Sequence, residues 1–122
     1  MADVIRDDDS AEFFDGTARG ELMIKRCDAC GHYLRPDSIA CSVCHGAALS
    51  WTDACGRGSV VSWIVVHGSE SETTVGLVEL DEGPWLHARL VGVDTKTLSV
   101  GDAVEVGFES AGTEAVPVFH PA

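Results

Sequence analysis

Four cysteines in two matched pairs have the types and spacing to bind a metal ion. Cys27 and Cys30 form one C-x-x-C pair and Cys41 and Cys44 form another, with ten residues between the pairs. Each pair is short enough for both sulfurs to reach one ion at about 2.3 Å, so the two pairs supply four soft ligands in a tetrahedron. Because such a closed site leaves no position for a substrate, we expect structural zinc.

Other roles for these cysteines remain open. Iron in a rubredoxin-like site uses the same four ligands, although we consider it second to zinc. The run Cys41–His45 also matches the C-x-x-C-H haem attachment motif, which would leave Cys27 and Cys30 without a role. Disulfides are disfavoured because residues 1–9 are acidic with no apolar signal core, so we expect a reducing cytoplasm. The fifth cysteine, Cys55, is expected to be a small buried hydrophobe.

The charge of the chain argues against one class of partner. Asp and Glu total 20 against 8 Lys and Arg, which gives a net charge of −12. Because nucleic-acid binding draws much of its affinity from basic residues that displace counterions, no nucleic-acid partner is expected. No membrane association is expected either, since no apolar run approaches the roughly 20 residues that span a bilayer.

Half of the basic residues lie close in sequence to the first cysteine pair. Their charges could offset four zinc-bound thiolates, or they could form an anion site for a phosphorylated ligand such as CoA. The sequence leaves both interpretations open. These residues are Arg19, Lys25, Arg26 and Arg35.

No catalytic residue is predicted. The five histidines are scattered, and the sequence contains no nucleophile-elbow, P-loop or dinucleotide-binding motif. His67 ends one expected strand and His87 lies within another, positions that are typical of surface or satisfied core histidines. The sequence therefore favours a binding or scaffolding subunit over an enzyme.

The element expected to precede the cysteines is a helix. Residues 1–20 are interpreted as an acidic tail followed by a helix from Ser10, as its cap, to Arg19. Phe13 and Phe14 are adjacent and cannot share one narrow helical stripe. They are therefore candidate contacts, either with the barrel of this chain or with a partner protein.

Short strands account for the rest of the chain. Residues 21–52 are expected to form a rubredoxin-like zinc ribbon, and residues 53–122 a small, partly open OB-fold barrel of five strands. A small sandwich would give the same pattern. The run Ser59–His67 is almost continuously apolar, which predicts a strand buried on both faces. The other four barrel strands are expected at residues 73–80, 85–91, 103–108 and 115–119.

A series of short motifs, in order along residues 10–121, resembles a known family. They are residues 13–16 (FFDG), 20–22 (GEL), 26–31 (RCDACG), 56–63 (GRGSVVSW), 78–83 (VELDEG) and 117–119 (PVF), together with Pro36, the second cysteine pair and Trp51. The chain is similar to the DUF35 family, whose members join a rubredoxin-like zinc ribbon to an OB-fold and are associated with acyl-CoA metabolism.

The resemblance implies a non-catalytic accessory subunit. Members of the family resemble small subunits that assemble with thiolases, HMG-CoA synthases, acyltransferases or the retro-aldolases of steroid side-chain breakdown, and related domains are fused to an acyl-CoA hydratase subunit. A role in passing a CoA thioester between two active sites is a further implication. By this resemblance the four cysteines hold zinc, while the leading helix and the barrel face the partner.

Two other functions remain open from the sequence. The first is an autonomous acyl-CoA binding domain, in which one of the clustered basic residues meets the CoA phosphates and the barrel takes the acyl chain. The second is a single-stranded nucleic-acid binder, because OB-folds stack bases on aromatic side chains such as Trp63 or Trp85. The net charge of −12 opposes the second function.

Overall fold

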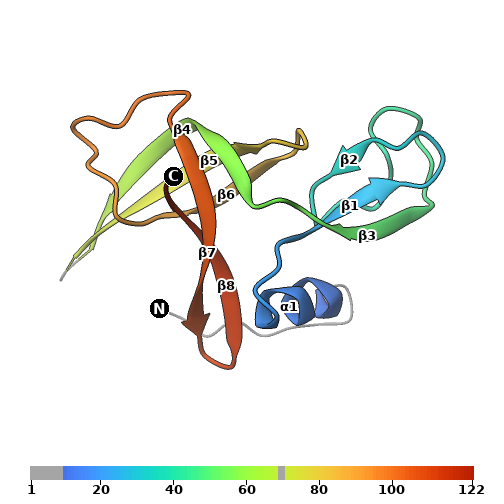
Figure 1. Cartoon of the computed structure of the whole chain (residues 1–122), viewed down its shortest axis with the longest axis horizontal. Coiled ribbons are helices and arrows are strands. Elements are labelled where there is room, and N and C mark those ends of the chain that lie inside the picture. Colours follow the sequence, from blue (N-terminus) through green and yellow to red (C-terminus); the bar gives the residue numbers. More distant parts are fainter. Residues whose placement is uncertain (1–9, 69–70) are drawn as a thin grey trace.

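The computed structural model describes residues 10–68 and 71–122, so the predicted tail, residues 1–9, lies outside the described part. One helix and eight strands form a mainly β architecture there (Figure 1). The predicted order of helix, ribbon and five-stranded barrel is confirmed. The elements are α1 (Ala11–Ala18), β1 (Met23–Cys27), β2 (Tyr33–Leu34), β3 (Leu49–Asp53), β4 (Arg57–His67), β5 (Glu72–Leu80), β6 (Trp85–Leu90), β7 (Ala103–Ala111) and β8 (Glu114–Pro121).

The leading helix α1 is short and packs against β8 and β1. Ser10 stands at its N-cap position, where its carbonyl accepts a hydrogen bond from the Phe14 N–H (3.1 Å), but its side chain makes no capping bond. Gly20 follows the helix in a left-handed conformation (φ 77°), which glycine adopts without a Cβ clash. Within the described residues, no helix is long and apolar enough to cross a membrane.

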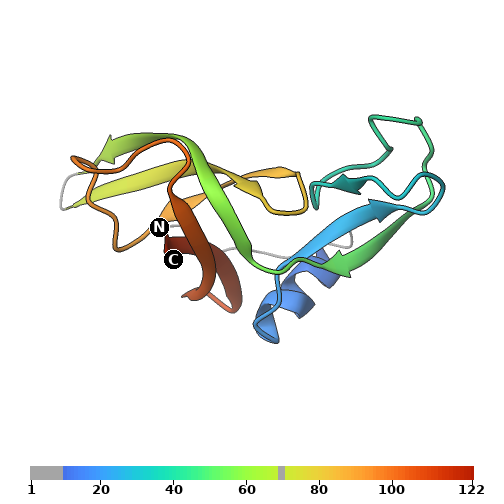
Figure 2. The ribbon, with the colours of Figure 1, turned by 45° about the horizontal axis from the view of Figure 1, so that its top comes forward.

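The ribbon is a three-stranded antiparallel sheet in the order β2-β1-β3. Figure 2 shows it as a lobe separate from the barrel, with the chain passing from β3 into β4 and α1 below the junction. Cys27 ends β1, and the other three predicted ligands lie in the loops beyond β1 and β2. The two cysteine-bearing loops are therefore held in place by the three strands of this sheet.

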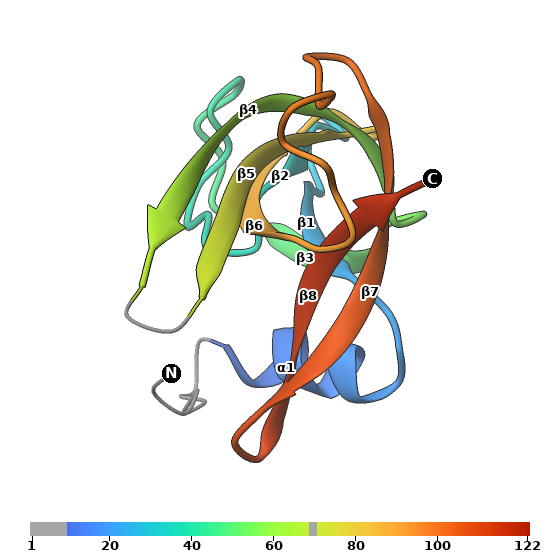
Figure 3. The same cartoon turned by 90° about the vertical axis from the view of Figure 1, so that its left-hand side faces the viewer.

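The five strands β4 to β8 close into a barrel with the order β4-β5-β6-β8-β7. Neighbouring strands are antiparallel except β6 and β8, which are parallel. This order is that of an OB-fold, and the closed barrel rules out the sandwich alternative. The closure between β4 and β7 involves three residue pairs, from Arg57 to Ser59 on β4 (Figure 3).

The main hydrophobic core lies inside the barrel but includes two residues from the base of the ribbon. Leu22 and Ile24 are buried to 1% and 0% exposure and belong to the same cluster as the barrel side chains. The base of the ribbon thus packs into the barrel core, so the two parts are joined by buried side chains as well as by the connecting chain. The remaining members of the cluster are Val60, Val78, Leu80, Leu86, Leu90, Val104 and Phe119.

The expectation that residues 59–67 are buried on both faces is wrong for the second half of β4. Ile64 is 63% exposed and Val66 is 48% exposed, whereas Trp63 is partly buried against the core. Along the second half of β4, exposed side chains alternate with partly buried ones, and no other element of the described structure packs over the face on which Ile64 and Val66 lie. Apolar composition could not distinguish a doubly covered strand from a singly covered one.

The expectation for Cys55 is also wrong, because this residue is exposed. It lies between β3 and β4, directly before Gly56, which turns the chain in a left-handed conformation (φ 82°). Its N–H donates to Glu82 Oε2 (2.7 Å), and its Sγ lies 3.8 Å from Glu82 Oε1 and 3.9 Å from Asp81 Oδ2. The thiol therefore faces the polar turn between β5 and β6 and not the core.

Candidate metal centre and interdomain cavity

The first cysteine pair forms a tight loop at the end of β1. The Gly31 N–H donates to the Cys27 carbonyl (2.9 Å), and the Cys27 N–H donates to the His32 carbonyl (2.9 Å). Gly31 adopts a left-handed conformation with φ of 79°. The glycine turn lets the chain fold back around the sulfur of Cys27.

The second pair forms a loop with the same two backbone hydrogen bonds. The His45 N–H donates to the Cys41 carbonyl (2.9 Å), and the Cys41 N–H donates to the Gly46 carbonyl (2.8 Å). The Val43 N–H also points at Cys41 Sγ (3.4 Å). Two equivalent loops, each supplying two sulfurs, are the arrangement that a closed tetrathiolate site requires.

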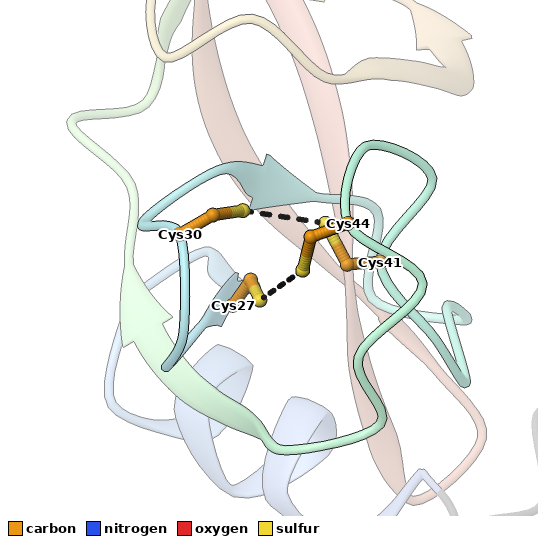
Figure 4. A group of neighbouring side chains, drawn as sticks. All are labelled: Cys27, Cys30, Cys41 and Cys44. Atoms are coloured by element: carbon orange, nitrogen blue, oxygen red, sulfur yellow. Dashed lines mark hydrogen bonds between the residues drawn. The ribbon is translucent and has the colours of Figure 1, made fainter.

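The structure brings the four predicted ligands into one cluster (Figure 4). All four sulfurs lie within 4.8 Å of one another, with Cys27 Sγ 3.5 Å from Cys44 Sγ and Cys30 Sγ 3.6 Å from Cys41 Sγ. Tetrahedral coordination with bonds of about 2.3 Å places sulfurs about 3.8 Å apart, so the cluster fits a metal ion. The four thiols are free, and both pairs face one centre, which disfavours haem attachment by the second pair.

The thiols differ in how readily they lose a proton. The backbone amide of Cys30 lowers the pKa of Cys27 from 9.0 to about 7. The backbone amide of Cys44 likewise lowers the pKa of Cys41. The amide of His32 lowers the pKa of Cys30, but burial and the neighbouring thiols outweigh it and raise that pKa to about 12. The first thiol of each pair therefore loses its proton more readily than an ordinary thiol, whereas Cys30 holds its proton more tightly, so a bound cation must displace that proton.

Apart from the metal cluster, the ribbon has little to hold it together. Its own buried cluster consists of Cys27, Cys41 and Leu34, with Leu49 partly buried against them. Two of the three buried members are therefore metal ligands. A structural metal can contribute on the order of 10 kcal/mol to a ribbon of this kind, which is more than one leucine can supply. The centre is a structural metal site.

A cavity of about 540 Å³ lies where α1, the ribbon and the barrel meet. Phe13 and Phe14, the predicted contact residues, both line it, and their rings pack edge to face with centroids 5.3 Å apart. Phe14 is 8% exposed, so it also packs within the chain. The rest of the lining is Ser10, Lys25, Arg35, Pro36, Asp37, Ile39, Trp51, Leu86, His87 and Pro117.

Two of the four clustered basic residues reach this cavity. Lys25 Nζ donates to the Ser38 carbonyl (2.7 Å) and lies 4.9 Å from the centroid of the Trp51 ring. Arg35 forms an exposed ion pair with Asp37 (3.2 Å). These contacts hold both cations at the rim and leave their charge only partly neutralised.

The other two basic residues lie elsewhere. Arg19 pairs with Glu21 (3.2 Å), and Arg26 lies over the Tyr33 ring (5.9 Å) on the strand position after Lys25. Successive strand residues face opposite sides of a sheet, so Lys25 and Arg26 cannot serve one ligand through β1. The structure does not assemble all four cations into one site.

Sequence reasoning missed several cavity residues. Leu86 and His87 come from β6, and Pro117 comes from β8, whereas Trp51 belongs to the ribbon. These residues are far apart in sequence, and no local pattern links them. Only the strand order of the barrel brings them to the side that faces α1.

The aromatic residues considered for base stacking are otherwise engaged. Trp63 packs against the barrel core. Trp85 is 45% exposed, but its Nε1–H donates to Glu79 Oε2 (2.8 Å). A carboxylate beside the most exposed of these rings repels a phosphate backbone, which weakens the nucleic-acid interpretation further.

Comparison with known proteins identifies both parts of the chain. The model for the "ChsH2, rubredoxin-like zinc ribbon domain" matches residues 14–50, and the model for the "ChsH2, C-terminal OB-fold domain" matches residues 51–109. A probable enoyl-CoA hydratase alpha subunit from Thermomonospora curvata is 34% identical over 93% of this chain. The chain spans only 38% of the length of that subunit.

In two further comparisons, the match covers most of this chain and most of the related protein. A DUF35 domain-containing scaffold protein from Methanothermobacter thermautotrophicus is 28% identical, over 79% of this chain and 77% of the relative. A solved chain of the "Ltp2-ChsH2(DUF35) aldolase" is 31% identical with a TM-score of 0.84, over 97% of this chain and 98% of that chain. Sequence and structure thus agree over both the ribbon and the barrel, and the chain belongs to the DUF35 family.

Proposed function

We propose that this chain is a non-catalytic accessory subunit of a thiolase-like or retro-aldolase enzyme that acts on acyl-CoA thioesters, in lipid or steroid side-chain metabolism. The observation that carries the proposal is the likeness to the DUF35 chain of an aldolase over nearly the full length of both chains. We further propose that the bound metal is zinc, that the protein works in the cytoplasm, and that an acyl-CoA hydratase is a second possible partner, in keeping with the hydratase alpha subunit relative.

The site chemistry supports a role without catalysis. The metal cluster uses all four sulfurs, so a bound ion keeps no open position for a substrate. In the cavity, the single carboxylate among the lining residues, that of Asp37, is paired with Arg35. His87 is the general-base candidate there, but the cavity lacks a nucleophile–base–carboxylate arrangement within the described residues. In the proposed assembly, the reacting groups belong to the partner, and this chain positions the partner or its substrate.

The direct test is to capture the tagged chain with its partner from its native cell extract. Mass spectrometry should find a thiolase-like or aldolase protein in near-equal amount, and that enzyme should lose activity or stability when this chain is removed. A control capture with an unrelated tagged OB-fold protein identifies non-specific binding. Recovery of the chain alone, still carrying its metal, would contradict the accessory role.

A second candidate, autonomous acyl-CoA binding, is favoured by one observation. The cavity combines aromatic and aliphatic walls with the cationic ends of Lys25 and Arg35, which suits an anionic ligand with an apolar part. Calorimetry with CoA on the isolated chain tests this candidate. Micromolar binding that Lys25→Ala abolishes and Arg26→Ala leaves unchanged would support it, since Arg26 lies outside the cavity lining. If CoA gives no heat of binding with the wild-type chain, this candidate is excluded.

A further inference from the structure

In the described structure, the second half of β4 (Ser62–His67) pairs with β5 on one side and with no strand on the other. We refer to this segment as the open edge. β4 pairs with β7 as far as Ser59. Val60 then makes two loop contacts on that side: its N–H donates to the Asp102 carbonyl (3.0 Å), and its carbonyl accepts from the Gly101 N–H (2.8 Å). Figure 3 shows β5 along one side of the open edge and no strand along the other.

A β-bulge marks the place where β4 leaves the barrel. The register with β5 shifts between Val60 and Ser62, so Val61 is the extra residue. A bulge bends the strand and increases its twist, which directs the following residues away from β7. The open edge is therefore a consequence of the bulge. Its six residues span about 20 Å.

The side chains of the open edge are unusually apolar for a free strand. Ile64 and Val66 point outward with 63% and 48% exposure, two positions apart as on one face of a strand. Val100, next to Gly101 in the loop that contacts Val60, is also exposed (71%). Residues 60–66 contain no charged residue and no proline. Proteins normally protect free edges with such residues, so their absence indicates an edge that is covered in the working assembly.

The charges around the open edge indicate what covers it. Asp102 lies beside the start of the open edge, where its carbonyl accepts from the Val60 N–H. At the other end, His67 is paired with Glu72 (3.1 Å), which lies on β5, the strand on the opposite side of β4. A second copy of this chain would bring its own acidic residues against these and add a second charge of −12. A segment of another protein with a basic residue at the end near Asp102 would instead be attracted. Charge complementarity therefore favours a different protein over self-association.

We propose that an extended segment of the enzyme partner adds to the open edge as a further β-strand. The segment would carry alternating apolar side chains that cover Ile64 and Val66, and a Lys or Arg near the end that meets Asp102. Main-chain hydrogen bonds along Ser62–His67 would supply the pairing, because every second residue of a strand directs both its N–H and its carbonyl to one edge. This inference rests on the proposed function.

The test compares hydrogen exchange in the full-length chain alone and in its purified complex with the captured enzyme. The amides on the open side of Ser62–His67 should exchange at least about tenfold more slowly in the complex. Ile64→Lys and Val66→Lys should each reduce the captured enzyme by about tenfold or more, because a charge would be buried under the added strand. Both positions are exposed, so the variants should keep the melting temperature of the wild type.

Thr113→Lys is the control for the added charge, because Thr113 is exposed in the turn between β7 and β8, at the end of β7 away from its pairing with β4. It should leave capture unchanged, and an equal loss in this control would overturn the inference. Captured enzyme with no added protection at Ser62–His67 would overturn the inference and leave the proposed function intact. Capture of no enzyme at all would overturn both. A dimer of the isolated chain with protected residues 62–67 would show that a second copy covers the edge, against the proposal.

Discussion

His45 occupies in the second cysteine loop the place that Gly31 occupies in the first. Both residues follow the second cysteine of a C-x-x-C pair, both donate their N–H to the carbonyl of the first cysteine at 2.9 Å, and both are left-handed, with φ of 62° and 79°. Glycine adopts this conformation without cost, whereas a residue with a Cβ is strained there. The second loop thus holds its metal ligands at an energetic disadvantage relative to the first.

Replacing His45 with glycine should stabilise the metal-bound protein by about 1 kcal/mol, because the strain is relieved and the exposed side chain loses little packing. Urea unfolding at fixed zinc concentration measures this change. Gly31→Ala is the reciprocal variant and should destabilise by a similar amount. A His45→Gly protein that is less stable than the wild type would mean that the imidazole makes a compensating contact.

Cys44→Ser should release the metal and unfold the ribbon while the barrel stays folded. The ribbon has only a small core of its own, which includes two metal ligands, whereas the barrel strands supply most of the larger apolar core. Metal content by elemental analysis and residue-level hydrogen exchange report the two effects. Cys55→Ser is the control: this exposed thiol lies outside the cluster, so its loss should leave metal content and stability unchanged. Full stability of Cys44→Ser without metal would refute a structural role for the ion.

Metal affinity should fall as pH is lowered. Each ligand must be a thiolate in the complex, so protons compete with the ion, and Cys30, whose pKa is raised to about 12, must release a proton on binding at neutral pH. Cys27, with a pKa of about 7, is largely a thiolate above neutrality and becomes protonated below it, which adds a further proton to displace. Competition with a chromophoric chelator across this pH range measures the change. Equal affinity on both sides of pH 7 would contradict the thiolate assignment.

Ile24→Ala should destabilise the barrel although Ile24 belongs to a strand of the ribbon. The side chain is fully buried in the barrel cluster, so its truncation leaves a cavity at a cost of about 2–5 kcal/mol. Arg26→Ala, an exposed change on the same strand, should cost less than about 1 kcal/mol. Chemical unfolding followed by circular dichroism compares the two variants. Equal stabilities would show that ribbon and barrel fold independently.

The sequence by itself determined the features that rest on local spacing. Each C-x-x-C pair is a motif of four consecutive residues, so the sequence alone predicted that the four sulfurs bind one ion. The structure brings these four sulfurs into one cluster. Five apolar runs separated by turn residues likewise predicted the five barrel strands, since each run is as long as one strand. Local chemistry was sufficient in both cases because neither depends on which strands become neighbours.

Only the tertiary structure decided the features that depend on strand order and register. Lys25 and Arg35 reach one cavity while Arg26 faces away, because alternate residues of β1 lie on opposite sides of the sheet. Ile64 is exposed because the bulge at Val61 shifts the alternation of β4 and because no other described element packs over the face on which Ile64 lies. An apolar strand has the same composition whether one or two of its faces are covered, so burial is set by the neighbours that the fold provides.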